Sequence, residues 1–191
     1  LDAIGFHITH ELCYTNILYM LDLAGIPLRQ EERDEAHPLV MAGGGVTFNA
    51  EPIAPFMDIM VLGDGEVVLQ DVLRELERAK AESLARPALL QRLAAIPGVY
   101  VPSLFEEHEG EMKPLLQGYE RVEKRVLKDL DDAPYPLDPP QPVGAVHDRY
   151  TIELARGCTR GCRFCHAGMV YRPVRERSLD TLDHILEQGL E

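Results

Sequence analysis

The sequence lacks the features that mark several classes of protein. No apolar run approaches the ~20 residues that a membrane-spanning helix needs, so we expect no part of the chain in a membrane. The first ten residues carry neither the basic start nor the small-residue cleavage site of a signal peptide. Hydrophobic residues make up 46% and charged residues 27% of the 191 residues, a balance typical of a globular domain rather than a disordered chain.

Positive charge is scarce overall. The chain has 19 basic against 32 acidic residues and a net charge of −13. This balance argues against a nucleic-acid groove spread over the chain, because phosphate binding needs clustered Lys and Arg. The exception is local: Arg156, Arg160, Arg163, Arg172, Arg175 and Arg177 lie close together in the sequence. Such an island indicates either a bound anionic ligand or a set of solvated side chains and helix-end pairs.

Cysteine is also rare, and its distribution excludes a secreted disulfide framework. Three of the four cysteines fall between residues 158 and 165, whereas a disulfide framework spreads an even number along the chain. The clustering favours metal binding in a reducing compartment, and we predict that the protein is cytoplasmic.

The first part of the chain alternates short apolar runs with helical patterns. Strands are predicted over residues 2–8, 39–42, 58–62 and 98–104, and helices over 11–24, 51–56, 66–85 and 87–95. The stripe of the first helix comprises Leu12, Ile17, Leu18, Leu21 and Ala24. This alternation is typical of a parallel sheet covered by helices. We therefore predict an α/β fold, a partial doubly wound sheet of the Rossmann-like type.

Glycine turns follow two of the predicted strands. They are Gly43-Gly44-Gly45 and Gly63-Asp64-Gly65. Right-handed crossovers place both turns at the carboxyl edge of the sheet, where doubly wound folds bind ligands. Small residues let backbone N–H groups approach a phosphate, but any tight strand-to-helix turn also requires them. Gly43, Gly44, Gly63 and Gly65 are thus candidate cofactor-binding residues, with a purely structural role as the alternative.

The remaining residues predict a connector and a second domain. Residues 105–148 hold an acidic hairpin-like stretch at 106–111, a mixed strand or helix over about 119–130, and a proline-rich extended segment at 133–143. The predicted domains are 1–104 and 149–191, joined by this connector. In the second domain we expect a strand over 150–155, the cysteine loop, and a helix that Ser178 caps and that runs to about Gln188.

The cysteine loop carries the pattern most specific for chemistry. Residues 156–165 read RGCTRGCRFC, which places Cys158, Cys162 and Cys165 at C-x3-C-x2-C spacing. Thiolates are soft ligands suited to iron–sulfur clusters. Three ligands leave one iron of a four-iron cluster open to a cosubstrate, whereas a fourth cysteine would fill the cluster for electron transfer. The alternatives are a zinc site that needs a fourth ligand such as His166, and an electron-transfer cluster completed by Cys13, which we predict to be a core residue.

This loop, with its aromatic residue before the third cysteine, resembles the signature of the radical S-adenosylmethionine (SAM) superfamily. The resemblance implies that the preceding strand opens a partial β/α barrel and that Cys158, Cys162 and Cys165 hold a [4Fe–4S] cluster. It also implies that Phe164 packs near the adenine side of SAM. In that superfamily the open iron binds SAM, and one electron from the reduced cluster cleaves it to methionine and a 5′-deoxyadenosyl radical. The substrate is unknown, and an electron donor such as a flavodoxin or ferredoxin is implied.

The first part of the chain resembles the N-terminal domain of cobalamin-binding-type radical SAM proteins. Residues 11–28, 41–45, 48–52 and 63–66 carry this likeness, and with 171–178 the whole resembles an uncharacterised bacterial family that fuses the two domains. Cobalamin is therefore a candidate cofactor, with His7 and His10 as candidate polar contacts, although the cobalt-ligating D-x-H-x-x-G motif is absent. A cobalamin-like docking module is the alternative function. Because the chain begins without Met and ends just after a helical pattern, we expect a piece of a longer protein.

Overall fold

The computed structural model describes residues 1–137 and 150–189. It consists of two compact units, Leu1–Val126 and Leu127–Glu191, so the division falls inside the predicted connector. From residue 138 onward the predicted proline-rich segment lies outside the described residues. Within the described residues no helix is both long and apolar enough to cross a bilayer.

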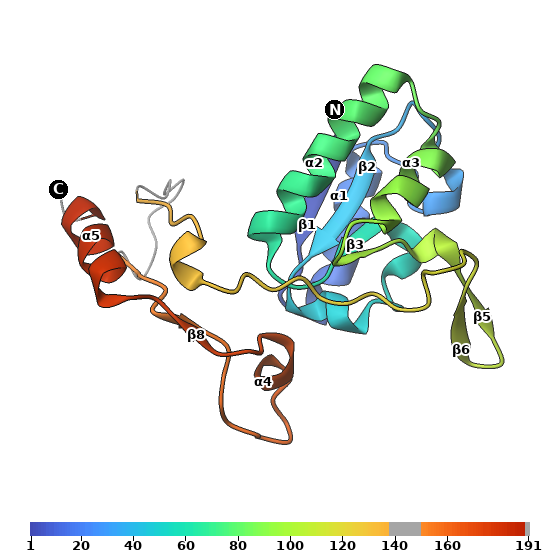
Figure 1. The fold of residues 1–191 in the computed structure, drawn as a ribbon. Coiled ribbons are helices and arrows are strands. Elements are labelled where there is room, and N and C mark those ends of the chain that lie inside the picture. Colours follow the sequence, from blue (N-terminus) through green and yellow to red (C-terminus); the bar gives the residue numbers. More distant parts are fainter. Residues whose placement is uncertain (138–149, 190–191) are drawn as a thin grey trace. The chain divides into compact units, whose positions relative to one another are not determined.

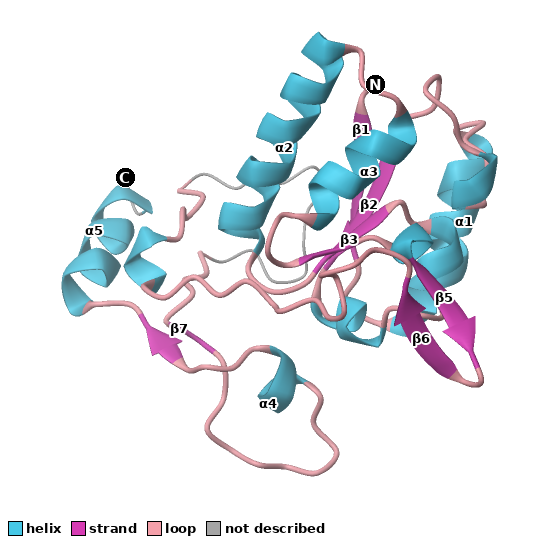
Figure 2. Cartoon of the chain, turned by 45° about the vertical axis from the view of Figure 1, so that its right-hand side comes forward, coloured by secondary structure: helices cyan, strands magenta, loops and turns pink. Residues whose placement is uncertain are grey.

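The first unit is built on a four-stranded sheet in the order β1-β2-β3-β4 (Figure 2). The strands β1 (Ala3–His7), β2 (Leu39–Gly43) and β3 (Ile59–Val61) run parallel, and β4 (Val99–Tyr100) pairs antiparallel with β3. In the pairing, His7 lies beside Gly43, and Gly43 beside Val61. The three parallel strands therefore end together at one edge. The predicted α/β class is confirmed, and the antiparallel β4 makes the sheet mixed.

Helices cover both faces of this sheet (Figures 1 and 2). After β1 come the 3-10 helix η1 (Glu11–Cys13), α1 (Tyr14–Leu23) and η2 (Gln30–Glu32), and after β3 come α2 (Gly65–Glu82) and α3 (Arg86–Ala94). Alternate residues of β2 enter different cores: Leu39 and Met41 pack with α2 and α3, whereas Val40 and Ala42 pack with α1. Because both faces of β2 are covered, its sequence is a continuous apolar run, as a central parallel strand requires.

Two helical predictions in this unit are wrong in detail. Two 3-10 helices, η3 (Gly45–Asn49) and η4 (Ala54–Phe56), replace the helix predicted over 51–56. Pro52 and Pro55 lack the N–H groups that an α-helix would use there. The α-helix after β1 begins at Tyr14, and Leu12 is 83% exposed instead of lying on the buried stripe.

The residues after β4 also belong to the first unit. Following η5 (Pro102–Leu104), β5 (Phe105–His108) and β6 (Glu111–Pro114) form the predicted acidic hairpin. Tyr119 then packs into the core, where its hydroxyl donates to the Val99 carbonyl at 2.7 Å and accepts from the Val101 N–H at 3.0 Å. Burial raises the pKa of Tyr119 to about 12, which keeps this hydroxyl protonated. No helix or strand forms over residues 119–129, contrary to the prediction.

In the second unit, short strands flank the cysteine loop. The 3-10 helix η6 (Leu130–Asp132) precedes β7 (Ala155–Arg156), which pairs antiparallel with β8 (Arg175–Glu176); α4 (Ala167–Val170) lies within the loop and α5 (Leu179–Gly189) follows it. Ser178 caps α5 as predicted, since its Oγ accepts from the Thr181 N–H at 3.2 Å. Of the strand predicted over 150–155, only Ala155 lies in a strand, as the first residue of β7. Among the described residues of this unit no strand runs parallel to β7, and the predicted start of a barrel is not confirmed.

Candidate functional site

All three predicted metal ligands lie on the loop between β7 and β8. Their thiols are free; Cys162 is exposed, and Cys158 and Cys165 are partly exposed. Two backbone hydrogen bonds shape this stretch: the Cys165 N–H donates to the Cys162 carbonyl at 3.1 Å, and the Arg160 N–H donates to the Cys158 Sγ at 3.4 Å. The loop therefore presents soft donors at the surface and already turns one N–H group toward a sulfur.

The chemistry of this donor set fits an iron–sulfur cluster. Three free thiols on one short loop are the ligands that such clusters take, and none is used in a disulfide. The thiols are not gathered into a closed site: within residues 1–137 and 150–189, no three Cys, His, Asp or Glu side chains converge closely enough to hold a metal ion. His166, the candidate fourth ligand for zinc, is exposed and completes no such group.

The two ends of the cysteine loop, residues 155–157 and 171–176, come together at Gly157; we call these two ends the arms of the loop and the place where they meet its neck. Its φ is +100°, and a Cβ there would lie 2.7 Å from the carbonyl oxygens of Tyr171 and of Pro173. A residue with a side chain would force the arms apart. Since Ala155 and Arg156 also pair with β8, the neck is closed by backbone contacts on both sides.

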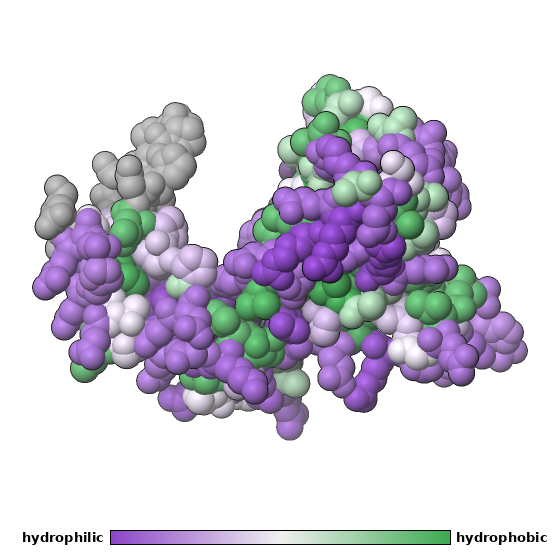
Figure 3. Space-filling view, turned by 45° about the horizontal axis from the view of Figure 1, so that its top comes forward, coloured by the Kyte–Doolittle hydropathy of each residue, from purple (hydrophilic) through white to green (hydrophobic). Residues whose placement is uncertain are grey.

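Three large apolar side chains of the cysteine loop are exposed. Phe164 is 92% exposed, and Met169 and Tyr171 are exposed as well. Hydrophobic patches among hydrophilic residues are visible on the face drawn in Figure 3. An exposed ring next to Cys165 is available to contact a ligand, and the predicted contact of Phe164 with adenine stays a prediction.

The arginines near the cysteines divide into two groups. Arg175 and Arg177 are buried, and Arg156 holds Glu153 through two hydrogen bonds of 2.9 and 3.0 Å. By contrast, Arg160 and Arg163 are exposed on the loop itself. Part of the basic island is thus structural, and the exposed part remains a candidate contact for an anion.

The two strained glycine turns of the first unit are occupied by the protein's own backbone. Gly44 has φ +109°, and its Cβ would lie 2.4 Å from the Ile8 carbonyl oxygen. Gly63 has φ +105°, and its Cβ would lie 2.0 Å from the Arg125 carbonyl oxygen. Arg125 pairs with this turn: its N–H donates to the Leu62 carbonyl and its carbonyl accepts from the Asp64 N–H, both at 2.9 Å.

These contacts favour the structural role of the glycines over cofactor binding. The Asp64 N–H, just before the first residue of α2, donates to the Arg125 carbonyl and is not available to a ligand. Gly43 makes only an ordinary contact with Val61, and Gly65 faces open space. Cobalamin binding at these turns therefore stays a prediction.

Three further residues considered in the sequence lie near this edge. His7 is the last residue of β1 and His10 follows three residues later; both are exposed, and the His10 ring lies 3.6 Å from the Cys13 Sγ. Cys13 is partly buried against the core beneath α1, as predicted. None of the three belongs to a group that could hold a metal ion in the described part of the chain.

Replacing Gly63 by alanine is expected to destabilise the first unit by roughly 2–4 kcal/mol, because the new Cβ would collide with the Arg125 backbone at a left-handed φ. Gly65→Ala is the matched control, since it lies at the start of α2 in open space and should be neutral or stabilising by up to about 1 kcal/mol. Urea unfolding followed by circular dichroism measures both. Equal stability of the two variants would show that Arg125 does not occupy the turn.

A buried charge cluster at the amino end of β3 was missed by the sequence analysis. Asp58 is 1% exposed, and its Oδ2 accepts from Arg33 Nη1 at 3.0 Å, Arg86 Nη2 at 2.8 Å and the Val40 N–H at 2.7 Å. The other bonded donors of the two arginines reach carbonyl oxygens of the surrounding loops: Pro27, Leu28 and Phe56 for Arg33, and Asp34, His37 and Pro38 for Arg86. Asp58 thus ties the loops at the amino edge of the sheet together.

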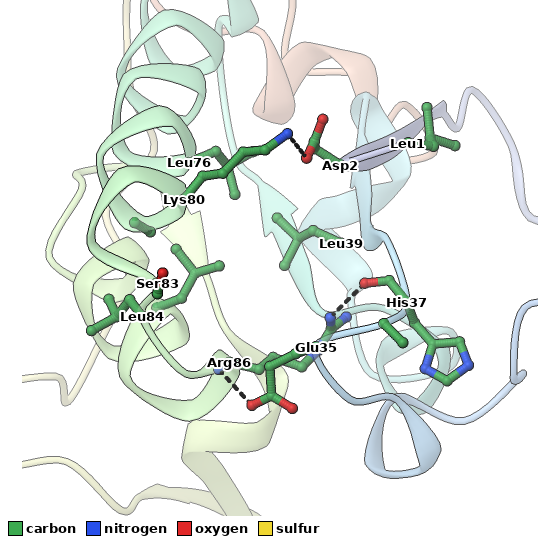
Figure 4. Close-up of a pocket in the computed structure, with 13 residues that line it drawn as sticks. Leu1, Asp2, Glu35, His37, Leu39, Leu76, Lys80, Ser83, Leu84 and Arg86 are labelled. Carbon is green, nitrogen blue, oxygen red and sulfur yellow. Dashed lines mark hydrogen bonds and ion pairs between the residues drawn. The ribbon is translucent and has the colours of Figure 1, made fainter.

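A cavity of about 430 Å³ lies at the same amino edge (Figure 4). Leu39, Leu76 and Leu89 contribute its apolar walls. Its charged groups are already paired, Lys80 with Asp2 at 2.6 Å and Arg86 with Asp58. None of the predicted cofactor residues lines it, and it lies at the edge opposite the glycine turns.

Comparison with known proteins decides the family. Residues 1–102 match the family model of the N-terminal part of radical SAM proteins. The chain belongs to the radical SAM proteins. This radical SAM chain is also 27% identical, over 195 aligned residues, to an uncharacterized protein of Methanocaldococcus jannaschii; the match covers 100% of the chain and 35% of that protein. The chain thus spans about a third of the length of this curated relative.

The family match and the cysteine motif are separate observations, because residues 1–102 do not include the cysteine loop. Radical SAM proteins in general use a [4Fe–4S] cluster and SAM. A family assignment from the first unit and a cluster-type donor set in the second therefore agree on the same chemistry.

Proposed function

We propose that the full-length protein is a radical SAM enzyme in which Cys158, Cys162 and Cys165 ligate a [4Fe–4S] cluster. The observation that carries this proposal is the set of three free thiols at C-x3-C-x2-C spacing on one surface loop, in a chain whose first unit belongs to the family. The substrate is unknown, and a flavodoxin or ferredoxin is the proposed electron donor.

The cluster, when bound, supplies the electron that cleaves SAM to methionine and a 5′-deoxyadenosyl radical. The chain's own residues would bind the cluster and orient SAM. The three thiolates would hold the cluster, and a set of three protein ligands would leave one iron available to SAM. Phe164 offers an exposed ring beside the last ligand, suited to stacking on a base, and the exposed Arg160 and Arg163 offer positive charge to an anionic group.

An iron–sulfur electron carrier is the competing function for the same loop. It requires a fourth cysteine, and Cys13 is the remaining one in the chain. Cys13 is partly buried against the core beneath α1, with His10 beside its sulfur. A side chain with a packing role of its own favours the three-ligand cluster. A pure docking module would need neither the free thiols nor their spacing.

To test the proposal, the full-length protein is reconstituted anaerobically with iron and sulfide, and dithionite and SAM are then added. We expect 5′-deoxyadenosine and methionine to form, with dithionite replacing the protein electron donor. Omission of SAM or of dithionite should abolish the product. A loaded cluster that yields no 5′-deoxyadenosine would contradict the enzyme and favour the electron carrier.

A further inference from the structure

The neck of the cysteine loop is held by a segment that lies far from it in sequence. Residues 127–133, here called the brace, contain η6 and end at Ala133, the first residue of the predicted proline-rich segment. The brace contacts the two buried arginines and the serine that directly follow the loop. Within the brace, Leu130 is 1% and Ala133 is 5% exposed, so it packs as part of the second unit.

Arg177 makes the central contact. Its side chain is 1% exposed, and Nη1 donates to the brace carbonyls of Leu130 at 2.8 Å and Ala133 at 3.2 Å. Its Nε donates to the Glu153 carbonyl at 3.1 Å, two residues before β7, and its Nη2 lies 3.7 Å from the Glu153 carboxylate. The guanidinium also lies over the Tyr135 ring, 5.7 Å from its centroid. One buried side chain therefore joins the brace to the strand that enters the loop.

Arg175 and Ser178 extend the same arrangement. Arg175 Nη1 donates to the Leu127 carbonyl at 2.8 Å, while its Nε and Nη2 reach the Pro173 and Tyr171 carbonyls on the returning arm of the loop, at 3.1 and 3.4 Å. The Ser178 N–H donates to the Asp131 carboxylate at 3.0 Å. Hydrogen bonds from the side chain and the backbone of Ser178 lower the pKa of Asp131. Brace, returning arm and first turn of α5 are thus bonded to one another.

The cysteine thiols and the neck of the loop differ in burial, which indicates what these contacts do. The thiols lie at the surface, whereas the neck carries buried, hydrogen-bonded guanidinium groups. Arg177 bonds to carbonyl oxygens through Nε and Nη1, while its buried Nη2 has only the 3.7 Å ion pair with Glu153. Such bonds fix geometry, because each lost bond leaves a buried polar group unpaired. Metal sites depend on partners beyond the ligands that orient them, and the burial around a cluster sets its potential.

We propose that Arg177 and the brace are positioning elements that hold the cysteine loop for its cluster. The inference rests on the proposed function, since it names the support of the same loop. Arg177 touches neither thiol nor cosubstrate in this account; it acts through the neck, by joining the brace to residue 153 and β8.

Arg177→Ala, Arg177→Lys and Arg78→Ala in the full-length protein form the test. Arg78 is the matched control, because its side chain is 71% exposed on α2. In Arg177→Ala we expect amide exchange at residues 153–157 and 175–178 to rise about tenfold or more, and iron release to a chelator to accelerate about tenfold. The cluster that remains should have a shifted midpoint potential, because the charge and the solvent exposure around a cluster both set its potential. Arg177→Lys should recover part of each effect, and Arg78→Ala should change none.

Unchanged amide exchange in Arg177→Ala would contradict the proposal that Arg177 and the brace hold the loop. A lower cluster content with an unchanged midpoint potential would overturn the positioning role and leave Arg177 a folding residue. If Arg177→Ala does not fold, Asp131→Ala removes the brace contact to Ser178 and leaves the buried guanidinium in place, with a smaller rise in exchange expected at 175–178. An unaltered protein that binds no cluster would contradict the proposed function. The amide-exchange experiment would still show whether the brace holds the ends of the loop.

Discussion

Alanine in place of any one of Cys158, Cys162 or Cys165 is expected to remove the cluster from the full-length protein. Two thiolates cannot hold a four-iron cluster at three corners, and the remaining candidate on the loop, His166, is a harder ligand than the thiolates that iron–sulfur clusters prefer. Iron should fall from about four atoms to below one per chain, and 5′-deoxyadenosine formation should fall by more than about 100-fold. Iron and sulfide analysis after anaerobic reconstitution, with product quantified by chromatography, measures both effects.

Cys13→Ala is the control that tests whether the fourth cysteine of this chain is a cluster ligand. Cys13 lies partly buried against the core beneath α1, so its loss should leave iron content and product formation unchanged. A Cys13 variant that loses its cluster would show that four cysteines are ligands. Full activity after the loss of one loop cysteine would remove that residue from the ligand set.

The second large effect is expected at Asp58, in the charge cluster of the first unit. Its carboxylate is the acidic partner that two buried guanidinium groups share. Asp58→Ala would leave both arginines in a buried site without this partner, and removing one member of a buried ion pair costs about 3–5 kcal/mol. The first unit should therefore unfold at much lower urea concentration, as measured by circular dichroism of the full chain.

A surface ion pair of the same kind provides the comparison for Asp58. Asp71 pairs with Arg74 on α2 at 2.6 Å, but the Arg74 side chain is 58% exposed. Asp71→Ala should lower the free energy of unfolding by at most about 1 kcal/mol. Similar losses at the two positions would mean that Asp58 does not organise the amino edge of the sheet.

The parts of this structure that local pattern controls were predictable from the sequence. The apolar run of β2 signalled a strand buried on both faces, and Ser178 before an amphipathic run signalled the start of α5. The spacing of the three cysteines predicted that they lie on one short loop, and the structure places them there; their binding of a metal stays a prediction. These signals depend on neighbours within a few residues.

The features that were missed depend on contacts between distant residues. Gly63 was interpreted as a candidate phosphate turn, but the backbone that fills it comes from Arg125. Asp58 meets Arg33 and Arg86 from positions 25 and 28 residues away, a spacing that follows no helical or strand period. The contact of Arg177 with Leu130 spans 47 residues. No short-range sequence pattern predicts these contacts, because the residues are neighbours only in the folded protein.

The most direct test of the three-ligand cluster is electron paramagnetic resonance of the reduced full-length protein before and after SAM is added. An iron without a protein ligand is open to SAM, so the account predicts the signal of a reduced [4Fe–4S] cluster whose shape changes on SAM addition. It also predicts that this change survives in Cys13→Ala. A cluster signal that SAM leaves unchanged would contradict the open iron, and with it the assignment of Cys158, Cys162 and Cys165 as the complete set of protein ligands.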